Sequence, residues 1–213
     1  MRPVLATDDP VWYVAYASNL RAQRLGCYLA GGRPEGARRT YEGCRDAAPP
    51  TRDVLLTLPG QVVFAGRSGV WGGAMAFYDP AAASEVVARG YLITFGQLSD
   101  LVSQEAQHPI GRNLTPAQVA GRPWPTPSRV YESIVHLGDR GGVPMFCLTS
   151  LQDLEPAPPS RAYLRTILLG LGEVWSSTAD ERADYLLGRR GVSPRWTAEH
   201  LVALCDEEVS PSA

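Results

Sequence analysis

The order of the apolar runs limits the fold of this chain more than any other feature of its sequence. Six or seven short runs typical of strands come first, few helical patterns lie between them, and from Ser160 onward the pattern is helical. A doubly wound parallel sheet would need a helix after nearly every strand. The order therefore predicts an α+β fold. Because no internal repeat or domain boundary interrupts it, residues 1–213 are expected to form a single domain.

The strands are expected where apolar residues run together or alternate between turn residues. They are predicted at 11–15, 53–58, 61–65, 70–78, 89–95, 129–138 and 143–150. Pro59-Gly60 and the Asp-Arg-Gly-Gly turn at 139–142 each predict a hairpin between the flanking strands. Thr94 followed by Gln97 resembles a capping box. This spacing predicts a helix that begins there and carries Glu105 near its C-terminal end.

Composition and charge argue against several classes of protein. A formal net charge of -2 provides no broad basic field for nucleic acid. No run approaches the roughly 18 apolar residues of a membrane span, and the first ten residues lack the apolar core of a secretory signal. We therefore expect a cytoplasmic protein that has neither nucleic acid nor a membrane as its partner.

The sequence also lacks the common patterns of metal and cofactor sites. The four cysteines form no Cys-x-x-Cys pair, and the three histidines are widely spread. Ser18 lacks the flanking glycines of a nucleophile elbow. We expect no metal and no cofactor. What stands out instead is the polar turn Tyr16-Ala17-Ser18-Asn19 after the first strand, at a position where ligand contacts are common.

Four segments, taken together, carry a resemblance to a known family. They are YVAYASNL from residue 13, FAGRSGVWGGAMA from residue 64, YLITFGQLSDLVSQEA from residue 91 and PPSRAYLRTILLGLGE from residue 158. In this order they resemble the Tyr-Gly-Ser-Asn-Leu signature, the Trp-x-Gly-Gly-x-Ala segment, the approach to the catalytic glutamate and the Pro-Ser-x-x-Tyr helix start of the γ-glutamylcyclotransferase-like family. The resemblance covers residues 11–173 in outline.

The resemblance implies a compact mixed β-barrel with peripheral helices, followed here by a helical C-terminal segment. It implies an enzyme that releases an amine or amino acid from a small γ-glutamyl compound while the glutamyl part closes to 5-oxoproline. The substrate's own α-amine is the nucleophile, so this reaction needs neither a metal nor a cofactor. Glu105 matches the family's general acid/base. The substrate-binding residues that the resemblance implies are Tyr16, Ala17, Ser18, Asn19, Leu20 and Tyr163.

Two features leave alternatives open. Ala17 stands where the family usually has glycine, and alanine would be disfavoured there if φ were positive. Ala17 favours a non-catalytic module that binds a small molecule, whereas Glu105 argues against one. Independently of Ala17, the same fold could serve an amide hydrolase or deacylase in which Glu105 activates water as the nucleophile. The second feature is a C-terminal helical extension, predicted at 176–213. Trp196 and Leu201 are expected to hold it against the domain, with a substrate mouth or a homodimer face as alternatives.

Overall fold

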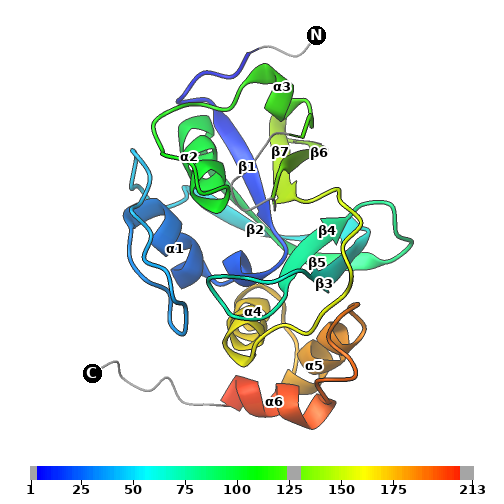
Figure 1. Ribbon diagram of the computed structural model, residues 1–213. Helices are drawn as coiled ribbons and strands as arrows, with labels where there is room; N and C mark the ends of the chain where they lie inside the picture. Colours follow the sequence, from blue (N-terminus) through cyan, green and yellow to red (C-terminus); the bar gives the residue numbers. More distant parts are fainter. Residues whose placement is uncertain (1–3, 124–130, 207–213) are drawn as a thin grey trace.

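The computed structural model describes residues 4–123 and 131–206, and its centre is a five-stranded mixed sheet (Figure 1). The strand order is β2-β5-β1-β7-β6, and a separate two-stranded sheet pairs β3 with β4. The strands are β1 (Pro10–Ala15), β2 (Arg52–Pro59), β3 (Gln61–Ala65), β4 (Met75–Asp79), β5 (Glu85–Thr94), β6 (Ser133–Arg140) and β7 (Val143–Thr149). The predicted α+β class is confirmed. The start of the strand expected at 129–138 lies outside the described residues.

Strand β1 lies in the middle of the large sheet and is buried on both faces. It runs antiparallel to β5 and parallel to β7. Val11 and Tyr13 belong to the core that lies against α1 (Ala22–Ala30) and α2 (Phe95–Glu105), whereas Val14 contributes to the core on the side of the C-terminal helices. Because a strand covered on both faces needs apolar side chains at every position, its sequence reads as a continuous apolar run.

The hairpin predicted at Pro59-Gly60 is wrong, because β2 and β3 belong to different sheets. Strand β2 pairs antiparallel with β5 along its whole length, from Arg52 opposite Leu92 to Pro59 opposite Glu85. Gly60 has a φ of +120°, and a Cβ there would lie 2.5 Å from the backbone oxygen of Asp79. The turn therefore redirects the chain from one sheet to the other instead of folding it back. The second predicted hairpin, β6 with β7, is confirmed.

The predicted barrel is not confirmed, because the described strands form an open sheet and a separate hairpin. Hydroxyl groups satisfy part of the β4 edge that faces β7. Thr149 Oγ1 accepts from Tyr78 N at 2.9 Å and donates to Tyr78 O at 2.8 Å. Ala76 O accepts from the hydroxyl of Tyr131 at 2.9 Å, and Ala76 N donates to that of Tyr163 at 3.3 Å. Thr149 of β7 thus links the two sheets through its side chain, while Tyr131 and Tyr163 satisfy the backbone of Ala76 from outside the sheets.

The helices lie around this sheet, with α1 and α2 beside β1 and the C-terminal helices below it (Figure 1). The capping box of Thr94 and Gln97 is confirmed at the start of α2, with the side chain of each bonded to the backbone N–H of the other. No described helix has the length and apolar character needed to cross a membrane. The helical elements are η1 (Ser18–Leu20), α1 (Ala22–Ala30), α2 (Phe95–Glu105), α3 (Pro116–Val119), α4 (Arg161–Val174), α5 (Ala179–Leu187) and α6 (Ala198–Asp206).

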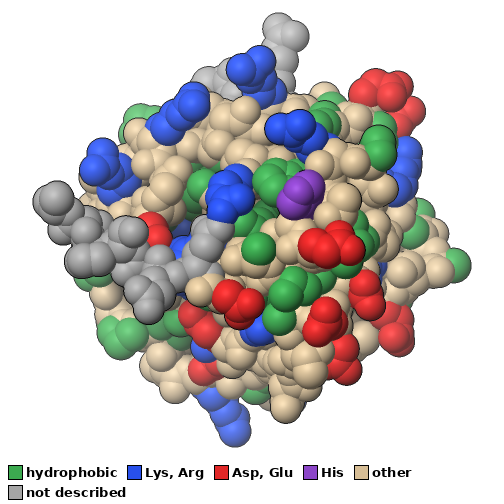
Figure 2. Space-filling view, turned by 90° about the horizontal axis from the view of Figure 1, so that it is seen from below, with side chains coloured by type: hydrophobic (Ala, Val, Ile, Leu, Met, Phe, Trp, Pro, Cys, Tyr) green, Lys and Arg blue, Asp and Glu red, His purple; other side chains and the backbone are tan. Residues whose placement is uncertain are grey.

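The C-terminal helices pack against α4, as expected for Trp196 and Leu201. Leu201 is completely buried, and the indole N–H of Trp196 donates to Pro159 O at 3.0 Å. Residues 207–213 of the predicted extension lie outside the described residues. The face seen from below in Figure 2 carries both signs of charge, with acidic side chains mainly in its lower half and arginines mainly in its upper half.

Candidate active site

One cavity of about 110 Å³ brings together Ser18, Glu105 and Tyr163, three residues that the sequence predicts for the site. They come from η1, the end of α2 and the first turn of α4, which lie far apart in the sequence. The connection between β3 and β4 forms another wall. The lining residues are Ser18, Arg24, Arg39, Tyr41, Arg67, Ser68, Gly69, Val70, Trp71, Met75, Glu105, Gln107, Tyr131 and Tyr163.

The side chains of the other predicted loop residues have partners elsewhere in the fold. The Tyr16 hydroxyl donates to Leu148 O at 2.8 Å, and the Asn19 side-chain amide donates to the Tyr13 hydroxyl at 2.7 Å. Leu20 is completely buried in the core. A substrate contact from Tyr16 or Leu20 would therefore be a backbone contact, whereas Asn19 Oδ1 has no hydrogen-bond partner within the described residues. Substrate binding by Tyr16, Ala17, Asn19 and Leu20 stays a prediction.

Ala17 has φ −139° and ψ −133°, outside the left-handed region that favours glycine. A residue with a Cβ can adopt this backbone without the penalty that positive φ would impose. After it, η1 begins, and the N–H of Leu20 donates to Ala17 O at 2.8 Å. The objection that alanine would need a positive φ at this position therefore does not apply.

Glu105 is the last residue of α2 and is half-buried at the cavity wall. The preceding Gln104 fixes this helix end, because its buried side-chain amide donates to Tyr28 O at 3.1 Å. The Tyr28 hydroxyl accepts from Arg24 Nη2 at 2.8 Å and donates to the Tyr41 hydroxyl at 3.4 Å. After burial, the nearby Glu105 is among the causes that raise the pKa of Tyr28.

Arg24 lies 3% exposed in an aromatic box beside Glu105. Its guanidinium carbon lies 4.1 Å from the ring centre of Tyr28 and 4.5 Å from that of Tyr41. Its Nη2 donates to both hydroxyls, at 2.8 and 2.9 Å. Within the described residues, its Nε and Nη1 have no hydrogen-bond partner. Burial lowers the pKa of Arg24, but the two tyrosines and Glu105 raise it by more, so the side chain stays charged.

The tyrosines around the cavity are kept in their neutral form. Burial raises the pKa of Tyr163 to about 12 and raises the pKa of Tyr28 well above its usual value. Tyr163 also packs on Trp71, with ring centres 5.3 Å apart. Burial raises the pKa of Tyr131 in the same way. A neutral phenol keeps one proton to donate. Tyr131 gives its proton to Ala76 O and Tyr28 gives its proton to Tyr41, whereas the Tyr163 hydroxyl accepts from Ala76 N and can donate to a substrate.

Sequence reasoning missed Arg24, Tyr28 and Tyr131. The first two carried a signal, because they stand four residues apart on the apolar face of α1 that Leu25 shares. An arginine on such a face is rarely fully buried unless it is paired. Tyr131 has a φ of +54°, which is uncommon for a residue other than glycine and marks a constrained position.

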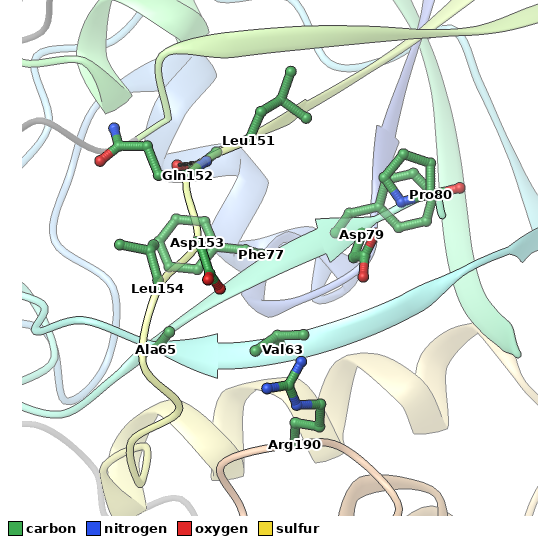
Figure 3. Close-up of a pocket in the computed structure, with 12 residues that line it drawn as sticks. Val63, Ala65, Phe77, Asp79, Pro80, Leu151, Gln152, Asp153, Leu154 and Arg190 are labelled. Atoms are coloured by element: carbon green, nitrogen blue, oxygen red, sulfur yellow. Dashed lines mark hydrogen bonds between the residues drawn. The ribbon is translucent and has the colours of Figure 1, made fainter. Parts of the chain in front are cut away.

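A second cavity of about 250 Å³ lies on the β3–β4 hairpin (Figure 3). Val63 and Phe77 supply apolar surface, and Asp153 and Arg190 supply charge. The Asp79 carboxylate in this cavity accepts from the Gln61 side-chain amide at 3.1 Å. None of the predicted site residues lines this cavity. The described residues contain no group of three or more His, Cys, Asp or Glu side chains that could hold a metal ion.

Comparisons with known proteins identify the fold. No protein-family model matches the chain. A solved structure of a γ-glutamyl cyclotransferase is 15% identical and similar over 92% of this chain and 98% of its own, with a TM-score of 0.53. A crystal structure of an uncharacterized protein from Homo sapiens is 16% identical over 92% of this chain and 99% of its own, with a TM-score of 0.52.

One curated relative also matches. The chain is 30% identical over 208 residues to Histone deacetylase 5 of Arabidopsis thaliana. The aligned region covers 87% of this chain and 31% of that protein. The chain thus spans about a third of the length of this relative. The structural likenesses confirm the predicted resemblance at the level of the fold: the chain has the γ-glutamylcyclotransferase-like fold.

Proposed function

We propose that the protein is an enzyme that cleaves a small γ-glutamyl compound, releases its amine or amino acid and forms 5-oxoproline. The observation that carries the proposal is the cavity in which Ser18, Glu105 and Tyr163 meet, because each comes from a different segment of the family resemblance. The fold shared with a γ-glutamyl cyclotransferase supports it. A cavity of about 110 Å³ suits a small acyl group better than a peptide.

In the proposed reaction, Glu105 takes a proton from the substrate's α-ammonium group. The free amine attacks the γ-carbonyl carbon, and a C–N bond closes the five-membered ring. The bond to the leaving nitrogen then breaks as Glu105 returns its proton to that nitrogen, and the second proton of the ring nitrogen passes to the released amine, which leaves as an ammonium. Attack within one molecule can contribute an effective molarity of roughly 10⁵ M or more. Positioning the amine and moving these protons are therefore the main tasks left to the protein.

Hydrogen-bond donors would stabilise the oxyanion that develops on the γ-carbonyl. The first N–H groups of a helical turn have no partner within that turn, so η1 offers the amides of Ser18 and Asn19 for this role. Tyr163 is a second donor, because its hydroxyl lines the cavity and stays protonated. Donors fixed in advance in this way act without a cost of reorganisation during the reaction.

The test follows 5-oxoproline by mass spectrometry during incubation with a panel of γ-glutamyl amino acids and amines. We expect wild type to form it and Glu105→Gln to lose at least about 10²-fold in rate, the range of general acid–base catalysis. Glu155→Gln is the matched control, because Glu155 is exposed and outside the cavity. Wild-type activity that survives Glu105→Gln would rule out the proposed base.

The same assay separates the proposal from an amide hydrolase. The Arabidopsis relative is named a deacetylase, and removal of an acyl group by water is the reaction of this alternative. A hydrolase activates water in place of the internal amine, so its product is the free acid and the ring does not form. Accumulation of free glutamate instead of 5-oxoproline would favour the hydrolase. If no substrate of the panel is cleaved, a binding module becomes the better interpretation.

A further inference from the structure

We propose that Arg24 binds the α-carboxylate of the γ-glutamyl group, so that the cavity recognises the charged head of the substrate as well as its amide. This inference rests on the proposed function, since it names a specificity-determining residue of the same site. It adds a residue that the family resemblance did not assign, and it starts from donors that the fold leaves without acceptors.

The first step concerns the unpaired donors of Arg24. Nη1 and Nε of a guanidinium together carry three N–H bonds. Within the described residues, neither nitrogen has a hydrogen-bond partner, although the side chain is 3% exposed. Buried polar groups in folded proteins nearly always have partners, because leaving a charged donor unsatisfied is costly. The free enzyme thus keeps a buried positive charge that an anion in the cavity would complete.

The second step concerns how firmly this charge is held. Two aromatic rings flank the guanidinium at 4.1 and 4.5 Å, and two hydroxyls hold Nη2 at 2.8 and 2.9 Å. The side chain therefore has little freedom left to lose when a ligand binds. Such preorganisation favours affinity, because the ordering cost is already met in the folded protein.

The third step concerns the match in charge. Arg24 and Glu105 line the same cavity, and Glu105 is among the groups that raise the pKa of Arg24. A carboxylate and a guanidinium therefore face the same small volume. The α-carbon of a γ-glutamyl compound carries an ammonium and a carboxylate next to each other. With the ammonium at Glu105, the carboxylate falls on the side of Arg24.

The experiment compares two substrates that differ only in this carboxylate. A γ-glutamyl compound cyclises to 5-oxoproline, and the matching 4-aminobutyryl compound, with the same leaving group, cyclises to 2-pyrrolidinone. We expect wild type to prefer the first by at least about 10²-fold in kcat/KM, the size expected when a buried charge loses its partner. Arg24→Met should remove most of this preference by slowing only the γ-glutamyl substrate. Arg24→Lys should restore part of it.

A merely structural role for Arg24 would give a different result. Arg24→Met would then slow both substrates by the same factor and leave the preference intact, which would overturn the proposal. A preference that follows a carboxylate on the leaving group instead of the one on the glutamyl part would also overturn it. Circular dichroism and a melting curve check that each variant folds.

A binding measurement on wild type and Glu105→Gln needs neither turnover nor an Arg24 variant. NMR titration with 5-oxoproline should show binding, and 2-pyrrolidinone, the same ring without the carboxylate, should bind at least about 10²-fold more weakly. Selective binding of 5-oxoproline without turnover of any γ-glutamyl compound would support Arg24 and count against the proposed reaction. Turnover with equal binding of the two rings, or with binding of neither at millimolar concentration, would overturn the role of Arg24 alone.

Discussion

The two cavities that touch the β3–β4 hairpin differ more in their lining than in their size. The smaller, about 110 Å³, contains Glu105 and a buried arginine with unpaired N–H groups. The larger, about 250 Å³, joins apolar side chains to charged groups at the surface, and its Asp79 carboxylate already has partners. No described residue that lines the larger cavity has a buried side-chain nitrogen or oxygen without a partner.

The difference teaches that buried polar atoms without hydrogen-bond partners indicate a binding site better than the volume of a cavity does. Hydrogen bonds inside the protein compensate for burying a polar group. The larger cavity has these bonds, whereas the smaller one keeps a charge whose donors point to no acceptor. A ligand of negative charge that enters the smaller cavity would give these donors an acceptor, and this contributes favourably to its binding free energy. Four predictions test this contrast.

The largest effect is expected at alkaline pH. Burial raises the pKa of Tyr163 from 10.0 to about 12, and it raises those of Tyr28 and Tyr131 as well. Between pH 10 and 12 the unfolded chain has lost these protons and the native protein still holds them, so stability falls as pH rises. Each such group lowers the free energy of unfolding by about 1.4 kcal/mol per pH unit in this window. The free energy of unfolding, measured in urea by tryptophan fluorescence, should therefore fall by several kcal/mol in total between pH 8 and pH 11.

Tyr163→Phe provides the control for that measurement. It removes one of the titrating groups, so the fall in unfolding free energy above pH 10 should become shallower by about 1.4 kcal/mol per pH unit. An unfolding free energy that stays constant up to pH 11 would contradict the description of these tyrosines as buried and neutral.

Gly170→Ala should disturb η1, the element that contributes Ser18 to the smaller cavity. Helix α4 lies so close to η1 that a Cβ on Gly170 would come within 2.4 Å of Arg21 N and 2.7 Å of Leu20 C. Overpacking against backbone should cost about 3 kcal/mol and move η1, with a loss of 5-oxoproline formation. Gly26→Ala, where the added Cβ meets nothing within 4 Å, is the matched control. It should raise stability by about 0.5–1 kcal/mol, as expected for alanine in a helix.

Tyr28→Phe should reduce catalysis and leave the fold intact. The variant keeps the ring beside Arg24 but removes the hydroxyl that accepts from its Nη2. A hydrogen bond to a charged group contributes roughly 1.5–3 kcal/mol, so kcat/KM should fall about 10-fold to 100-fold. Tyr185→Phe, which removes a hydroxyl bonded to Val87 N near the C-terminal helices, should keep full activity. Equal activity of both variants would mean that Tyr28 only fills space.

The smallest effect is expected in the larger cavity. Asp153 is exposed there, and surface substitutions of this kind usually change stability by less than about 0.5 kcal/mol. Asp153→Asn should therefore leave both the melting temperature and 5-oxoproline formation unchanged. A clear loss of activity in this variant would mean that the larger cavity, and not the smaller one, takes part in the reaction.

The sequence predicted the parts of the fold that depend on neighbouring residues. The start of α2 followed from Thr94 and Gln97, which lie three positions apart. Strand partners did not follow, because β2 pairs with β5 across the large sheet, and Pro59-Gly60 reads the same whether a turn closes a hairpin or joins two sheets. Glu105 and Tyr163 were found through the family resemblance. Arg24 was missed because a periodic pattern treats an arginine as surface.

The hydroxyl groups that hydrogen-bond the backbone at the edge of β4 restrict how this protein could evolve. Tyr131 and Tyr163 line the smaller cavity, and the same two oxygens satisfy the backbone of Ala76. A descendant that reshaped the cavity by replacing either tyrosine would also leave a backbone group at the edge of β4 without that partner. New substrate preferences are therefore more readily acquired at other residues that line the cavity, such as Arg67 and Val70.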